Sequence, residues 1–288
     1  MYRLIAVDVD GTLLRSDRTI SARTRAALGG AIARGAHLVV ATGRRRRSAT
    51  PILKELDLPH VLVASQGAAV WHDDELIFHR HLPTESAKIA LETIRRHALA
   101  SALLGNAQRE EVIWVDGDWR ANPRLAHYLE RNQPFLRPLA AAAFAHDPLE
   151  YILMESAERL ERLVEDLTGH HALPKIDPPA EPWPVLAAPL WRVIFSRGQF
   201  TAGAAVEIVG PTTSKAAALQ FLCDRLGITP AQVIAFGDNV NDVEMLEFAG
   251  LGVAMGNATD DARAAARKIA PSNDEDGIAA VLEEVGLA

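Results

Sequence analysis

The sequence predicts an α/β fold, a Rossmann-like core with a parallel sheet, interrupted by an inserted α+β domain. Short, nearly continuous apolar runs alternate with helical patterns at both ends of the 288-residue chain. Such runs are typical of strands buried on both faces of a parallel sheet, and their alternation with helices indicates right-handed crossovers. The middle of the chain differs, because its expected strands are separated by longer connections rich in proline and alanine. We therefore expect both ends of the chain to build one domain and the middle to build another.

The first part of the chain predicts alternating strands and helices. The expected strands are Leu4 to Val9, His37 to Ala41 and His60 to Ala64. A helix capped by Ser21 is expected to run to Arg34. The stretch from Ser48 to Leu56 is also helical, and Thr50 as cap with Pro51 at the first helical position would accommodate the proline.

The remaining elements define the domain boundaries. Toward the C-terminus the expected elements are helices at 215–226, 241–248, 260–267 and 277–285, and strands at 233–236, 251–254 and 268–270. In the middle they are strands at 112–115, 151–154, 191–195 and 205–209, and helices at 84–97 and 157–167. This division predicts a core domain of residues 1–81 and 211–288 and an inserted domain of residues 82–210.

Composition limits the class of protein. Apolar residues make up 49% of the chain and charged residues 23%, which suits a globular protein with a substantial core. The net charge of −7 disfavours nucleic-acid binding. No apolar run could span a membrane and no signal peptide is recognisable, so we expect a cytoplasmic protein. The single cysteine, Cys223, is expected in the core and cannot build a thiolate metal cluster within one chain.

A pair of carboxylates follows the first expected strand. Asp8 and Asp10 begin on the same side of that strand, and Gly11 then turns the chain. Ligands of open α/β sheets bind just beyond the carboxyl ends of the strands, and two carboxylates there suit Mg²⁺. One carboxylate could attack phosphorus, and the other could exchange a proton with the leaving oxygen and with water. The structural alternative is an ordinary Asp-Gly turn.

Two further segments could hold an anion. Thr42 and Gly43 follow the second strand, where a hydroxyl and free backbone N–H groups would form an anion cradle. Lys215 lies in the first turn of a helix, where its charge opposes the helix dipole unless a phosphate is held there. The alternatives are a helix cap for the first segment and a solvated surface lysine for the second.

A late strand ends in a second group of acidic and amide side chains. Gly237 closes this strand, Asp238 follows it, and Asn241 and Asp242 come three and four residues later. This pattern fits a metal site, with Asp238 facing the cation. It also fits an Asx cap on the following helix, and both can hold together.

These four ordered motifs resemble those of haloacid dehalogenase (HAD) superfamily phosphatases. More narrowly, the chain resembles the Cof-type branch (subfamily IIB), which carries a large cap domain between the second and third motifs. The closing segments 253–258 and 272–277 are also similar to that branch. The resemblance implies a Mg²⁺-dependent phosphatase that hydrolyses small phosphate monoesters through an aspartyl-phosphate. Sugar phosphates, nucleotides, flavin phosphates and pyridoxal phosphates are the expected substrates, and no nucleic acid or membrane partner is expected.

The resemblance also implies a role for each motif residue. Asp8 would be the nucleophile and a Mg²⁺ ligand. Asp10 would be the general acid and base and bind Mg²⁺ through its backbone carbonyl, and Asp238 would be the third ligand. The phosphoryl oxygens would be held by the Val9 and Gly43 amides, Thr42, Lys215 and Asn241. Asp242 would orient Lys215 or a metal-bound water, and Gly237 would support this loop.

Some residues depart from the family pattern or stand outside it. The branch usually shows Asn-Gly after the third strand, whereas this chain has Gln66-Gly67, so any contact of Gln66 with substrate would be displaced. Arg45, within the run 44–47, either belongs to a solvated helix face or binds a second anionic group of the substrate. His72, His79 and His81 are more typical of core or surface histidines than of a zinc site. The candidate cap contacts to substrate are Arg120, Trp191 and Arg192.

Two other functions stay open at this point. A phosphomutase would use the same Asp8 chemistry but return the phosphoryl group to its substrate. A non-catalytic phosphate-binding protein would need neither Asp8 nor Asp10 as reactive groups, and is disfavoured because the full set of reactive residues is present.

Overall fold

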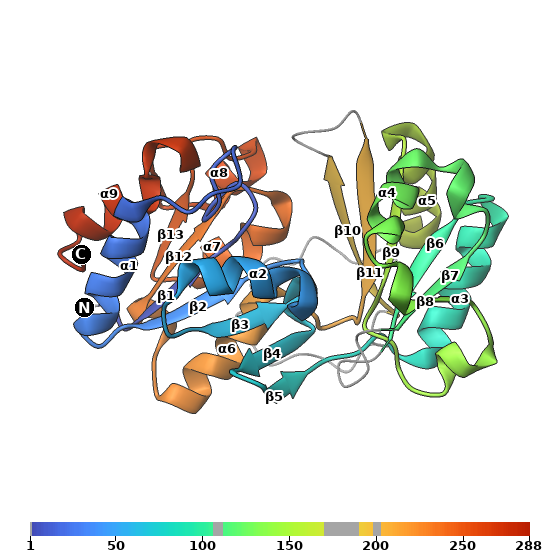
Figure 1. Ribbon diagram of the computed structural model, residues 1–288, viewed down its shortest axis with the longest axis horizontal. Coiled ribbons are helices and arrows are strands. Elements are labelled where there is room, and N and C mark those ends of the chain that lie inside the picture. Colours follow the sequence, from blue (N-terminus) through green and yellow to red (C-terminus); the bar gives the residue numbers. More distant parts are fainter. Residues whose placement is uncertain (1, 106–111, 170–189, 198–202) are drawn as a thin grey trace. The chain divides into compact units, whose positions relative to one another are not determined.

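The computed structural model describes residues 2–105, 112–169, 190–197 and 203–288 (Figure 1). The chain divides into two compact units, one of residues 1–79 with 214–288 and one of residues 80–213. The sequence analysis placed the boundaries after residues 81 and 210, and the division of the structure falls after residues 79 and 213. The first unit is called the core unit below, and the second the inserted unit.

The core unit is built on a sheet whose central strands are parallel. Its strands in spatial order are β14 (Lys268–Ile269), β13 (Leu251–Ala254), β12 (Val233–Gly237), β1 (Leu4–Val7), β2 (His37–Ala41), β3 (Val61–Ala64), β4 (Ala69–His72) and β5 (Glu75–His79). From β14 to β3 every neighbouring pair is parallel, and β4 and β5 add an antiparallel hairpin. All four residues of β1 are buried, because β1 lies between β12 and β2. Its unbroken apolar run is therefore a consequence of its central position.

Helices of the core unit follow most of these strands. They are α1 (Ala22–Ala33), α2 (Arg46–Leu56), α6 (Lys215–Leu226), α7 (Val243–Phe248), α8 (Asp260–Ala265) and α9 (Gly277–Glu284). Ser21 caps α1 by accepting a hydrogen bond from the Thr24 amide, as predicted. α6 ends at Gly227, whose φ of 62° is a left-handed conformation that glycine adopts without strain.

The inserted unit is an α+β unit with its own sheet. The strands in spatial order are β10 (Arg192–Arg197), β11 (Ala204–Val209), β9 (Glu150–Glu155), β6 (Ser101–Leu104), β7 (Ile113–Asp116) and β8 (Leu136–Pro138). Its helices are α3 (Thr84–Arg96), α4 (Pro123–Glu130) and α5 (Ala157–Gly169). A separate apolar cluster joins α3 and α5 to this sheet, and the buried Tyr151 hydroxyl donates to the Ala87 carbonyl. The predicted fold class, an α/β core with an inserted α+β unit, is confirmed.

The predicted start of α2 is wrong. The helix begins at Arg46, so Thr50 is not its cap and Pro51 lies inside it. The Thr50 hydroxyl donates to the Arg46 carbonyl at 2.9 Å, one turn back. Because Pro51 lies only in the second turn, it removes one helical hydrogen bond without ending the helix.

Cys223 packs in the apolar cluster of the core unit, as predicted. Burial, with a contribution from Asp224, raises the pKa of its thiol to about 11, against about 8.5 for a free cysteine. At pH 8 the folded protein should therefore react with a disulfide reagent at least about 100-fold more slowly than the denatured protein, because only the thiolate reacts. The chain has one cysteine, so a colorimetric thiol assay with and without guanidinium measures this ratio directly. Equal rates would show that the thiol is accessible.

No helix within the described ranges has both the length and the apolar character needed to cross a membrane.

Candidate active site

The loop after β1 holds Asp8 in a buried position beyond the strand end. The Asp8 amide donates to the Phe236 carbonyl of β12 at 3.0 Å, which continues the sheet by one residue. The chain then folds back, and the Leu13 amide donates to the Asp8 carbonyl at 3.1 Å. Gly11 makes this return possible, because its φ is 86° and a Cβ atom there would collide with the Asp238 carboxylate.

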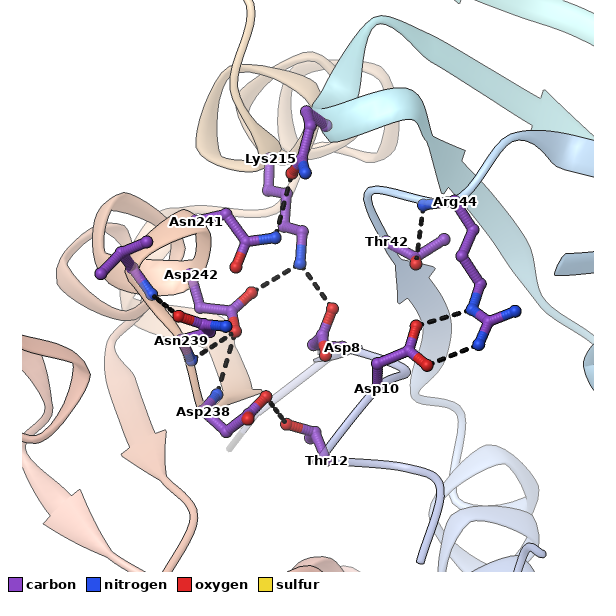
Figure 2. Close-up of polar contacts among 12 residues, drawn as sticks. Asp8, Asp10, Thr12, Thr42, Arg44, Lys215, Asp238, Asn239, Asn241 and Asp242 are labelled. Carbon is purple, nitrogen blue, oxygen red and sulfur yellow. Dashed lines mark hydrogen bonds and ion pairs between the residues drawn. The ribbon is translucent and has the colours of Figure 1, made fainter. Parts of the chain in front are cut away.

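Lys215 lies between two carboxylates (Figure 2). Its Nζ donates to Asp8 Oδ1 at 2.5 Å and to Asp242 Oδ1 at 2.6 Å. All three side chains are buried. Ser214 caps α6 by accepting from the Ala217 amide, which fixes the start of the helix from which Lys215 extends. The lysine is therefore part of the site, and the alternative of a solvated surface lysine is wrong.

The loop after β12 completes the carboxylate group. Asp242 Oδ2 accepts hydrogen bonds from the amides of Asp238 and Asn239 at 2.9 and 3.1 Å, so this side chain also caps the turn. Asp238 Oδ1 accepts from the Thr12 hydroxyl at 3.1 Å. One carboxylate oxygen each of Asp8, Asp238 and Asp242 lie within 4.8 Å of one another. This is the only such potential metal-binding group found among the described residues.

The electrostatics of this cluster favour an added cation. Among the described residues, the ammonium of Lys215 faces three buried carboxyl groups, so ionisation of all three would leave two negative charges in excess. Burial, and then repulsion from Asp242, raise the pKa of Asp8 well above its usual value, although Lys215 opposes this shift. Burial works against the Lys215 ammonium, but attraction to Asp242 and Asp8 outweighs it and raises the pKa of Lys215. The lysine therefore stays charged at neutral pH, and the site disfavours the Asp8 carboxylate unless a cation is added.

Asp10 points toward Arg44 and not toward Lys215 (Figure 2). The Arg44 guanidinium holds the Asp10 carboxylate by two hydrogen bonds of 2.6 and 2.5 Å. The Asp10 side chain is 54% exposed, so this carboxyl group is open to solvent. Sequence reasoning placed Arg44 only within an arginine run and missed this pair, because the two residues come from different loops.

The Thr42 turn lies between β2 and α2. The buried Thr42 hydroxyl accepts a hydrogen bond from the Arg44 amide at 3.1 Å. A Cβ atom at Gly43 would overlap the end of the Gln66 side chain, which would then have to shift. Asn241, from the loop after β12, donates from its Nδ2 to Gln66 Oε1 at 3.0 Å. The turn and Asn241 are thus joined through Gln66.

Other predicted residues have mixed outcomes. Gly237 lies against Asp242 with no room for a Cβ atom, and the main chain of Val9 is held by the Leu14 amide. The Arg45 side chain is only 3% exposed, so the solvated alternative is wrong for this residue, and its contact with a second anionic group stays a prediction.

His72, His79 and His81 form no metal-type cluster within the described ranges. The candidate cap contacts Arg120, Trp191 and Arg192 all belong to the inserted unit, and their roles stay predictions.

Sequence reasoning missed two asparagines that hold the loop after Asp8. Asn257 Nδ2 donates to the Gly11 carbonyl at 2.8 Å, and Asn273 Nδ2 donates to the Leu14 carbonyl at 2.8 Å. The two are linked, since the Asn273 amide donates to Asn257 Oδ1 at 3.1 Å. Both lie in the closing segments that had been noted only as a resemblance.

Comparison with known proteins agrees with this geometry. A family model described as haloacid dehalogenase-like hydrolase matches residues 5–282. A 5-amino-6-(5-phospho-D-ribitylamino)uracil phosphatase of Bacillus subtilis is 31% identical over 286 residues, which cover 98% of this chain and 96% of the relative. A solved haloacid dehalogenase-like hydrolase from Bacteroides thetaiotaomicron has a TM-score of 0.73 at 26% identity, covering 99% of this chain and 100% of that one. A solved sugar phosphatase of HAD subclass IIB has a TM-score of 0.76 at 20% identity, covering 99% and 100%, and it supports the fold alone.

The fold, the buried aspartate–lysine cluster and the family match define a HAD-type hydrolase. The chain belongs to the haloacid dehalogenase-like hydrolases. The family resemblance drawn from the motifs and the expected enzyme class, a HAD-type phosphatase, are confirmed.

Proposed function

We propose that this enzyme is a Mg²⁺-dependent phosphatase that hydrolyses small phosphate monoesters through an aspartyl-phosphate on Asp8. The observation that carries the proposal is the buried contact of Asp8 with Lys215, in a cluster of three buried carboxyl groups. An ammonium beside a carboxylate nucleophile reduces its repulsion with an anionic phosphate ester.

The oxygen donors of the site suit Mg²⁺. We propose the carboxylates of Asp8 and Asp238 and the main-chain carbonyl of Asp10 as its protein ligands. Asp242 is a poorer candidate, because both of its oxygens already accept hydrogen bonds from Lys215 or from backbone amides. A bound Mg²⁺ would neutralise the excess charge and orient the phosphoryl group.

The proposed reaction has two steps. An Asp8 carboxylate oxygen attacks phosphorus and forms an acyl phosphate, while the bond to the leaving oxygen breaks and Asp10 gives that oxygen a proton. Water then attacks the same phosphorus and loses a proton to Asp10, which releases phosphate and restores Asp8. Asp10 must release at least one of its two bonds to Arg44 to reach the leaving oxygen. We propose Val9, Thr42, Gly43, Lys215 and Asn241 as the groups that hold the phosphoryl oxygens.

The proposed substrates are small soluble phosphate esters such as sugar, nucleotide, flavin and pyridoxal phosphates, met in the cytoplasm. The name of the Bacillus subtilis relative adds 5-amino-6-(5-phospho-D-ribitylamino)uracil to this group. We further propose that the inserted unit acts as a cap that selects among these esters, since the core residues named above would bind only the phosphoryl group.

Phosphate release from a panel of these esters, measured with Mg²⁺ and with EDTA, tests the proposal. We expect release with Mg²⁺, its loss in EDTA and its recovery when Mg²⁺ is restored. Without a cation, the buried site disfavours the ionised carboxylate of Asp8 that must attack phosphorus. A hexose phosphate in the panel separates hydrolysis from isomerisation, since a mutase would yield an isomer and little free phosphate. Release that persists in EDTA would contradict the metal requirement, and no release from any ester would contradict the phosphatase assignment.

A further inference from the structure

The turn of Ser65, Gln66 and Gly67 has an unusual backbone. The φ angles of these three successive residues are 48°, 57° and 95°. Left-handed conformations are unfavourable for residues other than glycine, asparagine and aspartate, so the backbone is strained at Ser65 and Gln66. A strained turn of this kind persists only where surrounding contacts require it.

The contacts of this turn join two of the proposed phosphate-holding segments. The Gln66 amide donates to the Thr42 carbonyl at 3.2 Å, and the Ser65 amide donates to the Arg44 carbonyl at 2.9 Å. On its other side, Gly67 lies so close to the Ser214 carbonyl, at the start of α6, that a Cβ atom would collide with it. The turn therefore sets the spacing between the Thr42 turn and the helix that carries Lys215.

The Gln66 side chain reaches a third segment. It is 4% exposed, and its Oε1 accepts the hydrogen bond from Asn241 Nδ2 at 3.0 Å. Its amide also occupies the space that a side chain at Gly43 would need. An asparagine amide can present either its oxygen or its N–H₂ group to a ligand, and its orientation is set by its hydrogen-bond partners. Because Gln66 Oε1 is an acceptor, the Asn241 amide turns its N–H₂ group toward Gln66. One hydrogen of that N–H₂ group makes this bond, and the other can donate to a ligand.

We infer that Gln66 is a positioning residue that fixes the Asn241 amide with its N–H₂ group ready to donate to a phosphoryl oxygen. The inference rests on the proposed function, because it assumes that a phosphoryl group binds at this site. Without Gln66, Asn241 could rotate and present its carbonyl oxygen, which repels an anion. The residue thus acts through Asn241, and its contribution should appear in phosphate affinity and in KM.

Two substitutions distinguish an effect on the orientation of the Asn241 amide from a loss of side-chain packing at position 66. Gln66→Met keeps the length and approximate volume of the side chain but removes the amide. Gln66→Asn keeps an amide but is one methylene shorter, so it cannot reach Asn241 without movement. Asparagine tolerates the left-handed conformation better than glutamine, so Q66N should fold at least as stably as the wild type. Gln220→Asn, at an exposed position on α6, is the matched control.

The test measures the Kd of inorganic phosphate by titration calorimetry with Mg²⁺ present, together with KM, kcat and Tm, for each full-length variant. We expect Q66M and Q66N to raise Kd and KM about fivefold to tenfold, as for the loss of one hydrogen bond. The Tm of Q66N should stay unchanged or rise, and Q220N should match the wild type. In an Asn241→Ala background, Q66M should have no further effect on Kd, because its effect passes through Asn241.

The opposite results would overturn the inference. Wild-type affinity in Q66M would show that Gln66 only fills space, and additive effects of Q66M and N241A would show that it does not act through Asn241. If the wild type releases phosphate but these variants match it, the inference alone fails. If the wild type neither binds nor releases phosphate, the proposed function fails as well.

Discussion

The Asp8→Asn variant is expected to lose at least about 1,000-fold in kcat for phosphate release, because an amide cannot form the acyl phosphate. Asp8 is the carboxylate that contacts Lys215 directly beyond β1, and Asp10 is turned toward Arg44 instead. Steady-state phosphate release and trapping of the phosphoenzyme by acid quench with labelled substrate would measure the loss. The matched control is Asp57→Asn, an exposed residue in a left-handed conformation that asparagine also adopts.

The same variant should have the opposite effect on stability. In the metal-free enzyme, burial and repulsion from Asp242 hold the pKa of Asp8 well above the value near 4 of an unfolded chain. The group therefore contributes stability when protonated, and this contribution is lost as the pH rises through the folded pKa. Asparagine does not ionise, so metal-free D8N should gain stability relative to the wild type as the pH rises from about 4. Denaturant unfolding in EDTA at several pH values would measure this difference, and a constant difference would contradict the argument.

Replacing Lys215 by methionine is expected to damage both activity and stability. In the described part of the chain, Lys215 supplies the ammonium that contacts Asp8 and Asp242, and all three side chains are buried. Removing it leaves the carboxylates uncompensated, and breaking a buried pair in this way costs about 3–5 kcal/mol. The loss of charge stabilisation should also reduce kcat/KM by about 100-fold to 1,000-fold.

Added Mg²⁺ provides a specific check on the Lys215 variant. Because the cation compensates the same carboxylates, Mg²⁺ should raise the Tm of K215M more than that of the wild type. Lys268→Met is the control, since Lys268 pairs with Glu284 at the surface, where an ion pair is worth about 0–1 kcal/mol. Equal losses of stability in K215M and K268M would show that the buried contacts do not stabilise the fold.

Much of the core unit could be predicted because its strands are short, apolar and central. Residues 251–254 and helix 215–226 were predicted with the bounds that the structure shows, since glycine or a change in polarity marks their ends. The β4–β5 hairpin was missed because both strands are short and the apolar run of β5, Leu76 to Phe78, is only partly buried. The start of α2 was missed because Pro51 was treated as the first helical residue. The helix begins five residues earlier, at Arg46, and Arg45 is its N-cap residue.

The candidate site was predictable where chemistry and strand ends coincide, as for Asp8, Lys215 and Asp238. It was not predictable where polar contacts cross between loops. The pairing of Arg44 with Asp10 and the bond from Asn257 to the Gly11 carbonyl depend on the tertiary structure. Asn257 and Gly11 are 246 residues apart in sequence, and neither residue alone indicates the other.

The divided core unit has a consequence for synthesis on the ribosome. β1 pairs with β12, and α1 lies against α9, although the two members of each pair come from opposite ends of the chain (Figure 1). The inserted unit is continuous, from residue 80 to residue 213. It can therefore complete its sheet while β1 still lacks its neighbour β12, so the N-terminal segment must wait for the C-terminal part of the chain to emerge. Chaperones that shield exposed apolar strands would act on residues 1–79 during this interval.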